Sequence, residues 1–432
     1  MEYKKYKLGD ICKIFGRIGF RGYTTEDLVS SPSNGAISLS PSNIVDGIMD
    51  LSKCTYISWE KYEESPEIKI APNDIVLVKT GNSYGRTAII RNVEHPMTLN
   101  PQFVVLKDIQ INPVYLAYFL KTDEFQKQIY GIVGGSAIPT LSQENLANLI
   151  IRVPNDNIPN TIADILDSLD GKIELNKQIN DNLEAMAKQL YDYWFVQFDF
   201  PNEEGKPYKS NGGAMVWNEK LKREIPEEWN VANVFDELFV QYGFPFSTEL
   251  FTEEPTNIPI VRIRDILENS VSAYSEEEVD EKYKLQKQDL VIGMDGNFHM
   301  NYWNDNVSYL NQRSVRLRAK SKSTVSIMQV KYDIEPYIKA KELRVKGSTV
   351  GHLSDKDLKE LFVLVSPNAD FRNMFDSILA EIIENRCEMI ALTKQRDELL
   401  PLLMNGQALV NYHLSAFICS TIPLQIHFFI II

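Results

Sequence analysis

The chain has 432 residues, of which 44% are hydrophobic and 24% are charged, and this composition is typical of a globular protein with two or three domains. The formal net charge of -14 argues mildly against contact with nucleic acid, because phosphate groups are bound by Lys and Arg, although a basic face is not excluded. The four cysteines and five histidines are dispersed, so neither a disulfide framework nor a zinc site is predicted.

The N-terminal region predicts a mixed α/β domain over residues 1–157. Residues 1–7 are charged and lack an apolar signal core, so a cytoplasmic protein is expected. Residues 114–130 have helical periodicity, and a glycine-rich turn at Gly134-Gly135 follows them. Short apolar runs separated by turn residues predict strands at residues 75–78, 87–90, 103–106 and 149–153.

Two long amphipathic helices are predicted, at residues 158–200 and 368–406. In both, apolar residues recur with alternating spacings of three and four, which is typical of helices that pack lengthwise on one another. Asn176 and Asn385 occupy the same rung of the two ladders, and buried polar residues at such seams fix register and partner. The first ladder consists of Leu166, Leu169, Ile173, Asn176, Asn180, Leu183, Ala187, Leu190 and Trp194. The second consists of Phe375, Ile378, Ile382, Asn385, Met389, Leu392, Arg396, Leu399 and Leu403.

The plan of the first half restarts after residues 201–225, whose polar, Gly- and Pro-containing sequence predicts a linker. The matching segments are residues 73–76 with 288–291 and residues 133–142 with 345–354. An ordered series of such matches indicates a tandem duplication. A second domain is therefore predicted over residues 226–367.

Two other segments have more than one interpretation. The aromatic cluster at residues 193–200 could be a docking surface for a partner, or it could cap the coil against the first domain. The last stretch of the tail at residues 407–432, namely residues 417–432, is apolar, but Pro423, Gln425 and His427 interrupt it. It is shorter than the ~18 to 20 residues that a spanning helix needs. A disordered appendage is favoured over a membrane anchor, so no membrane contact is predicted.

These elements predict an α+β fold in which two mixed α/β domains are separated by two long helices. The helices pair as an antiparallel coiled coil, and the duplication gives the chain pseudo-twofold symmetry. About thirty helical residues span on the order of 45 Å, a little over one turn of B-DNA, which is the separation at which twofold DNA-binding dimers place their half-sites. Because the two domains differ in sequence, the predicted target is split and non-palindromic.

Five short motifs occur in order: YKLGDI at residues 6–11, LDSLDGKIE at 166–174, LEAMA at 183–187, IPEEW at 225–229 and LLPLLMNG at 399–406. With the duplication, they make residues 4–406 resemble the specificity (S) subunit of type I restriction–modification enzymes. The resemblance implies a non-catalytic subunit whose two target recognition domains each read one half of a bipartite, asymmetric site in double-stranded DNA. The tail after Gly406 has no counterpart in the family pattern.

The same resemblance implies partners and cofactors. The two helices would be the spacer and the docking surface for two methyltransferase subunits, with a restriction subunit that translocates DNA recruited around them. No cofactor is expected in this chain, whereas S-adenosylmethionine and ATP are expected on the partner subunits.

No catalytic centre is predicted. Asn100-Pro101-Gln102-Phe103 is similar to the tetrapeptide that holds the target amine in amino-methyltransferases, but its third residue differs and no glycine-rich turn precedes it. A turn that leads into a strand is the favoured interpretation. Glu67-Ile68-Lys69 could be half of a nuclease site, yet no suitably placed partner aspartate is evident.

The candidates for DNA contact are loop residues beside the predicted strands. Arg and Lys suit guanine or phosphate, and Asn suits adenine. A solvated surface position is an equal alternative for any one of them, and the hairpins at residues 79–86 and 295–301 are favoured. In the first domain the candidates are Arg17, Arg21, Lys79, Asn82, Tyr84, Arg86 and Ser136. In the second they are Arg262, Arg264, Asn297, His299, Asn301, Arg313, Arg316, Lys346 and His352.

A basic run in the second domain also has two interpretations: it could follow phosphates or line a solvated strand edge. Its members are Arg313, Arg316, Arg318, Lys320 and Lys322. Two other functions remain open for the chain as a whole. One is a single-chain nuclease or methyltransferase with a cryptic site, and the other is a coiled-coil adaptor without DNA binding, which the net charge makes worth considering.

Overall fold

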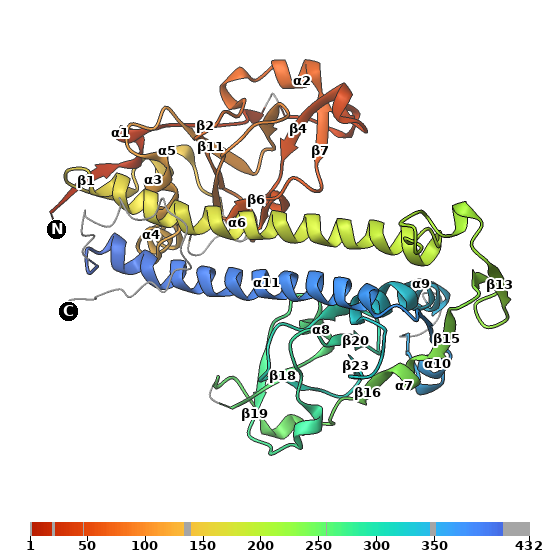
Figure 1. Ribbon diagram of the computed structural model, residues 1–432. Coiled ribbons are helices and arrows are strands. Elements are labelled where there is room, and N and C mark those ends of the chain that lie inside the picture. The colour runs from red at the N-terminus through yellow and green to blue at the C-terminus, as the bar shows by residue number, and fades with distance from the viewer. Residues whose placement is uncertain are drawn as a thin grey trace. The chain divides into compact units, whose positions relative to one another are not determined.

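The computed structural model describes residues 2–19, 22–45, 47–133, 140–255, 257–345 and 351–408. The chain forms two compact units, whose elements are drawn in Figure 1. The first unit combines residues up to Gly171 with those from Leu392 onwards, and the second consists of Lys172–Ala391. Arg21, Ser136, Lys346 and the tail from residue 409 lie outside the described residues.

The first unit contains two four-stranded sheets. One has the antiparallel order β2 (Lys13–Gly16), β11 (Phe103–Lys107), β8 (Ile75–Val78), β9 (Thr87–Ile89). The other has the order β10 (Met97–Leu99), β4 (Gly35–Leu39), β7 (Thr55–Ser58), β3 (Leu28–Val29), with β10 and β4 parallel. Strand β8 is apolar throughout because both of its faces are buried: Ile75 and Leu77 belong to one core cluster and Val76 to another.

The helix predicted at residues 114–130 is two helices, α3 (Pro113–Phe119) and α4 (Asp123–Val133). Thr122 separates them, because its backbone N–H and its hydroxyl both donate to the Phe119 carbonyl, at 3.0 and 2.7 Å. A hydroxyl that bonds to nearby backbone competes with helix propagation. The first unit is completed by α5 (Gln143–Ala147) and by β1 (Tyr3–Lys7), which pairs with β12 (Ile150–Pro154).

The second unit repeats this topology, which confirms the predicted duplication. Its antiparallel sheet has the order β16 (Leu238–Tyr242), β23 (Ser314–Ala319), β20 (Leu290–Gly293), β21 (Met300–Tyr302). Its second sheet has the order β17 (Phe251–Thr252), β19 (Ala273–Ser275), β18 (Ile258–Val261), β22 (Tyr309–Leu310), again with one parallel pair, β18 and β22. Strand β15 (Asn230–Asn233) pairs with β24 (Phe362–Val365), as β1 pairs with β12.

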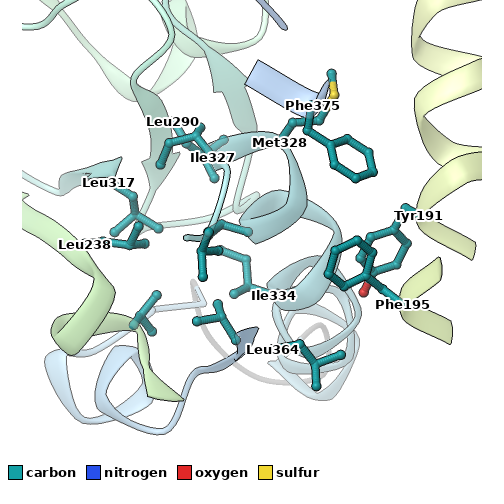
Figure 2. Close-up of a cluster of buried hydrophobic side chains, with 14 of the residues drawn as sticks. Tyr191, Phe195, Leu238, Leu290, Leu317, Ile327, Met328, Ile334, Leu364 and Phe375 are labelled. Atoms are coloured by element: carbon teal, nitrogen blue, oxygen red, sulfur yellow. The ribbon is translucent and has the colours of Figure 1, made fainter. Parts of the chain in front are cut away.

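The core of the second unit lies around α9 (Ile327–Val345). Figure 2 shows Ile327 of α9 beside Leu290 and Met328 of α9 beside Phe375, and all four residues are buried in one cluster. The aromatic residues at the end of α6 belong to the same cluster: Phe195 lies 5.1 Å from Trp229 and 5.9 Å from Phe375, measured between ring centroids. The idea that this aromatic cluster caps the coil against the first domain was therefore wrong, because the cluster packs into the second.

The segment predicted as a linker at residues 201–225 is not irregular throughout. It contains strand β13 (Met215–Asn218), which forms an antiparallel hairpin with β14 (Arg223–Pro226). The side chain of Asn218 stabilises the turn by accepting the N–H groups of Lys220 and Leu221, at 3.0 and 3.1 Å. A polar composition suits both a linker and a short exposed hairpin, so it did not distinguish them.

The two long helices are α6 (Ile158–Tyr191), which continues as a π-helix at Asp192–Val196, and α11 (Ala369–Met404). The predicted ladder positions are all buried or half-buried. In the second unit, Asn176 meets Glu388 and Asn180 meets Asn385, so later residues of α6 contact earlier residues of α11. This order confirms the antiparallel pairing.

The shared asparagine rung does not correspond to a contact. Asn385 Nδ2 donates to Asn180 Oδ1 at 2.9 Å, whereas Asn176 Nδ2 donates to Glu388 Oε2 at 2.7 Å. Asn176 and Asn385 are equivalent in the repeat, but antiparallel helices bring together positions counted from opposite ends. In the part of the chain that the structure describes, no helix is both long and apolar enough to cross a membrane.

Candidate nucleic-acid interface

In the first unit, the loop between β8 and β9 is held by main-chain hydrogen bonds to two other segments. Lys79 N–H donates to Gln102 O at 2.7 Å, and Lys79 O accepts from Leu141 N–H at 2.9 Å. Thr80 forms a bridge with Thr140, the first residue described after the glycine-rich turn. Three segments far apart in sequence therefore meet at Lys79.

The second unit builds the same junction at the loop between β20 and β21. Met294 N–H donates to Arg313 O at 2.8 Å, and Met294 O accepts from Leu353 N–H at 2.7 Å. Asp295 forms a bridge with His352. We call these two arrangements the first and the second loop junction.

Glycines shape both loops. The backbone φ is +93° at Gly81 and +83° at Gly85 in the first, and +71° at Gly296 in the second. These left-handed values favour glycine, which has no Cβ to clash with the backbone. Each loop therefore turns back within a few residues and presents its side chains at the end of the sheet.

The side chains on the two junctions differ in chemistry. On the first, Asn82 and Arg86 are exposed, Tyr84 is half-buried beside Tyr130, and Lys79 is half-buried. Burial lowers the pKa of the Lys79 ammonium, because removal from water disfavours a charged group. The first junction is thus a small cationic and amide surface.

The second junction is organised around a carboxylate. Asp295 accepts a hydrogen bond from His352 Nδ1 at 2.6 Å and one from Arg313 at 2.8 Å. Burial would raise the pKa of Asp295, but the hydrogen bonds from His352 and Arg313 outweigh it and hold the pKa below its ordinary value. Asn297 is exposed and His299 half-buried on the same loop. The carboxylate orients a histidine and an arginine whose side chains are 58% and 69% exposed.

Two of the predicted DNA contacts are buried. Arg17 is 5% exposed and donates to Leu99 O at 2.9 Å and to Thr98 Oγ1 at 3.2 Å. Arg316 is 7% exposed and donates to Lys284 O at 3.2 Å. Both guanidinium groups form hydrogen bonds inside their own domains, so neither is available to bind a duplex.

Two members of the basic run, Arg318 and Lys320, are also engaged within the domain, whereas Lys322 is exposed. Arg318 forms two hydrogen bonds of 2.6 Å with the buried carboxylate of Asp289, and Lys320 Nζ donates to two backbone carbonyls. The first unit has an equivalent ion pair between Lys107 and the buried Asp74. The interpretation of this run as a track for phosphates is wrong for these residues, because their charges are used in packing.

Three further candidates lie away from the junction contacts. Arg262 and Arg264 flank the start of α8 (Ile263–Ile266) and bond to Ser272, although the side chain of Arg264 stays 67% exposed. Asn301 faces inward: its Nδ2 donates to Leu267 O at 2.8 Å and its Oδ1 accepts from Arg386 at 3.1 Å. Asn301 therefore joins elements of the second unit and does not offer its amide to a base.

The junctions also contain residues that the sequence reasoning missed, namely Gln102, Thr140 and Asp295. Thr140 lies in one of the matching segments, residues 133–142, and Asp295 begins the favoured hairpin at residues 295–301, so an alignment of the two repeats position by position could have identified both. Asn100-Pro101-Gln102-Phe103 is the turn into β11, where Gln102 N–H donates to Asn100 Oδ1 at 2.9 Å. Among the residues described, no group of three or more His, Cys, Asp or Glu side chains is placed to hold a metal ion.

Comparison with known proteins identifies the family. A family model described as the type I restriction modification DNA specificity domain matches residues 1–185 and 226–401. The chain belongs to this family. Its two matched regions correspond to the two topological repeats, and each includes one loop junction.

Individual relatives agree. The chain is 28% identical over 368 residues to the type I restriction enzyme MjaIX specificity subunit of Methanocaldococcus jannaschii, covering 82% of both chains. It is 26% identical over 216 residues to the EcoBI specificity subunit of Escherichia coli, covering 48% of this chain and 41% of that one. A crystal structure of a type I restriction–modification S subunit from M. genitalium has the same fold, with a TM-score of 0.55 at 15% identity, covering 93% of this chain and 96% of that one.

Membership decides among the functions considered from sequence. Specificity subunits recognise DNA target sequences and are not catalytic. The comparisons support neither a single-chain nuclease or methyltransferase nor an adaptor without DNA binding.

Proposed function

We propose that this chain recognises a bipartite, asymmetric DNA site and reads one half-site with each loop junction. The observation that carries the proposal is that both repeats build the same main-chain junction and place different side chains on it. One scaffold with two side-chain sets suits two unlike half-sites. The target recognition domains would then be residues 1–157 and 226–367.

The chemistry of each junction suggests what it reads. On the first, Lys79 and Arg86 suit guanine or phosphate, and Asn82 suits adenine. On the second, Arg313 and His352 are hydrogen-bond donors that Asp295 holds in place, and the side-chain amide of Asn297 suits adenine. Arg21, Ser136 and Lys346 stay proposed contacts on the sequence alone.

The chain is proposed to act in the cytoplasm with two methyltransferase subunits and a restriction subunit, which would carry S-adenosylmethionine and ATP. Exposed apolar side chains near the end of α6 support a docking surface: Tyr193 is 38% exposed, Val196 46% and, on the neighbouring hairpin, Trp217 55%. Arg223 of that hairpin donates to Phe195 O at 3.1 Å, which holds the hairpin beside the helix end. With a net charge of -14, partner subunits would supply part of the phosphate contact.

Methylation mapping tests the proposal. The chain, expressed with its cognate methyltransferase subunits, should direct methylation to one motif with two different half-sites separated by unspecified bases. A double alanine substitution at Asn82 and Arg86 should change base preference in one half only, and the exposed Lys394→Ala serves as a control. An unsplit or palindromic motif would contradict the two-junction proposal.

A further inference from the structure

The second unit contains a cavity of about 550 Å³ between the end of α6, strand β14, helix α9 and strand β24. Its lining includes the aromatic side chains of Tyr191, Tyr332 and Phe362 and the aliphatic side chain of Leu364. Pockets that bind small ligands usually have volumes of about 300 to 1,000 Å³ and mostly apolar walls with a few polar groups. The cavity is therefore large enough to hold a small molecule or a long side chain.

The carboxylate of Asp333 lines this cavity and lacks a counter-ion. Its Oδ1 accepts a hydrogen bond from Tyr191 Oη at 2.7 Å, and its Oδ2 accepts from Gln329 Nε2 at 3.1 Å and Leu364 N at 3.2 Å. Among the described residues these three donors are uncharged, and Asp333 forms no ion pair. Carboxylates removed from water are ordinarily paired with a cation, so Asp333 can still gain one.

The cationic side chains around the cavity are engaged elsewhere. Two ion pairs lie on its wall, Lys188 with Asp192 and Lys339 with Glu335. Arg223 donates to Phe195 O at 3.1 Å, and its guanidinium lies 5.0 Å from the ring centroid of Phe198. Among the charged side chains that line the cavity, Asp333 is thus the carboxylate whose charge is not matched by a cation.

The aromatic wall favours a planar cation. The ring centroids of Tyr191 and Tyr332 are 5.0 Å apart, and Figure 2 shows the Tyr191 ring beside α9. Lys188 Nζ lies 5.6 and 5.9 Å from these two centroids, so the rings already face a positive charge. A guanidinium stacks on aromatic rings, is less strongly hydrated than an ammonium and can donate two hydrogen bonds to a carboxylate.

We propose that this cavity binds the guanidinium group of an arginine side chain of a partner subunit, with Asp333 as its counter-ion and Tyr332 as its stacking surface. The inference rests on the proposed docking of a methyltransferase subunit near the end of α6. Val196 connects the two features, because it lines the cavity and is one of the exposed apolar residues of that docking surface. Arginine is enriched among the interface side chains that contribute most to binding.

The first test uses the full chain without partners, with acetyl-arginine amide as the probe. Methyl NMR signals of Val196, Leu221 and Leu364 report on the cavity, because all three residues line it. We expect saturable shifts of these signals. Acetyl-citrulline amide, which has the same shape without the charge, should cause none, and acetyl-lysine amide should bind at least about fivefold more weakly. Equal binding of the arginine and citrulline probes, or none of the arginine probe, would overturn the proposal.

Asp333→Asn should weaken binding of the arginine probe at least about tenfold, since the counter-ion is lost. Asp355→Asn is the matched control, because Asp355 is an exposed carboxylate that does not line the cavity. Tyr332→Leu keeps the carboxylate but removes the stacking surface, so it should weaken binding several-fold. Undiminished arginine binding in both cavity variants would overturn the assignment.

The pH dependence of probe binding separates a counter-ion from a purely structural carboxylate. Burial raises the pKa of Asp333 to about 6, and a bound cation favours the ionised form. The neighbouring carboxylates Asp192 and Glu335 are already held by Lys188 and Lys339. Affinity for the arginine probe should therefore fall about tenfold from pH 7 to pH 5. An affinity that does not change with pH would contradict the role of Asp333.

The second test identifies the source of the arginine. Assembly of the full chain with its cognate methyltransferase subunit, measured by isothermal titration calorimetry at pH 7, should weaken at least about tenfold in Asp333→Asn and stay unchanged in Asp355→Asn. Unchanged assembly in Asp333→Asn would overturn the partner as the source. Failure of the proposed function is distinguishable, because it would appear as an unsplit or palindromic methylation motif while the cavity still binds the probe.

Discussion

Asp333 offers a prediction about stability that can be worked out from its surroundings. Its side chain is half-buried, and its carboxylate accepts hydrogen bonds from Tyr191 Oη at 2.7 Å, Gln329 Nε2 at 3.1 Å and Leu364 N at 3.2 Å. Burial is the largest influence and raises its pKa to about 6, against the opposing effect of the hydrogen bonds. The ordinary value for aspartate is about 3.9.

The sign and size of the effect follow from this shift. Because the folded state holds the Asp333 proton more tightly than the unfolded state, folding is favoured below pH 4 relative to higher pH. That advantage is lost as the pH rises through about 6. Two pKa units correspond to about 3 kcal/mol, so wild-type protein at pH 7 has a buried-charge penalty of roughly that size.

Asp333→Asn removes the titration. The unfolding free energy of the variant minus that of the wild type should therefore increase by about 2 kcal/mol between pH 4 and pH 7, because at pH 4 the unfolded aspartate is already about half protonated. Urea unfolding followed by tryptophan fluorescence measures it, because four of the five tryptophans, Trp194, Trp217, Trp229 and Trp303, lie in the second unit.

Asp355→Asn is the control for this experiment. Asp355 is exposed, and hydrogen bonds from Lys359 and Tyr242 lower its pKa, so its substitution should shift the pH dependence in the opposite sense. A difference between Asp333→Asn and wild type that stays constant across the pH range would refute the reasoning about burial.

Three other predictions concern recognition and folding. Replacing residues 230–365 with the equivalent domain of a relative should change one half of the methylated motif, and changes in both halves would show that the domains do not read DNA independently. Lys79→Ala and Arg86→Ala should each lower the slope of log affinity against log salt by about 1 if the side chain binds phosphate, as measured by fluorescence anisotropy on the complex. Asp289→Asn should destabilise the second unit by about 2 to 3 kcal/mol, because Arg318 would lose a buried partner. This value is at the low end for a broken buried ion pair, since the side chain of Arg318 is 26% exposed. An unchanged free energy of urea unfolding would disprove the prediction.

The long helices were predictable because their signal is local. Every rung of the two ladders follows from a 3–4 spacing along one stretch of chain, and burial of Leu166 and Ile382 confirms it. The duplication was predictable for a related reason, since an ordered series of matching segments needs no knowledge of contacts. The partner of Asn385 was not predictable in this way, because it depends on how two antiparallel helices align.

The candidate site was less accessible from sequence. The loops at residues 79–86 and 295–301 could be located from turn residues. Whether each arginine is buried or exposed could not be predicted. Arg17 bonds to a carbonyl 82 residues away and Arg318 to a carboxylate 29 residues away, and sequence composition does not distinguish such a buried cation from an exposed one. The π-helix at Asp192–Val196 likewise depends on tertiary packing of Trp194 and Phe195.

The way the two loops are anchored has a consequence for how such a protein can change its target. Lys79 and Met294 are held through their main-chain N–H and C=O groups, which every residue except proline provides. Substitutions on these loops can therefore alter the side chains offered to DNA while the anchoring bonds persist. Selection for a new target could then act on exposed positions such as Asn82 and Asn297 one at a time, with little loss of folding along the way.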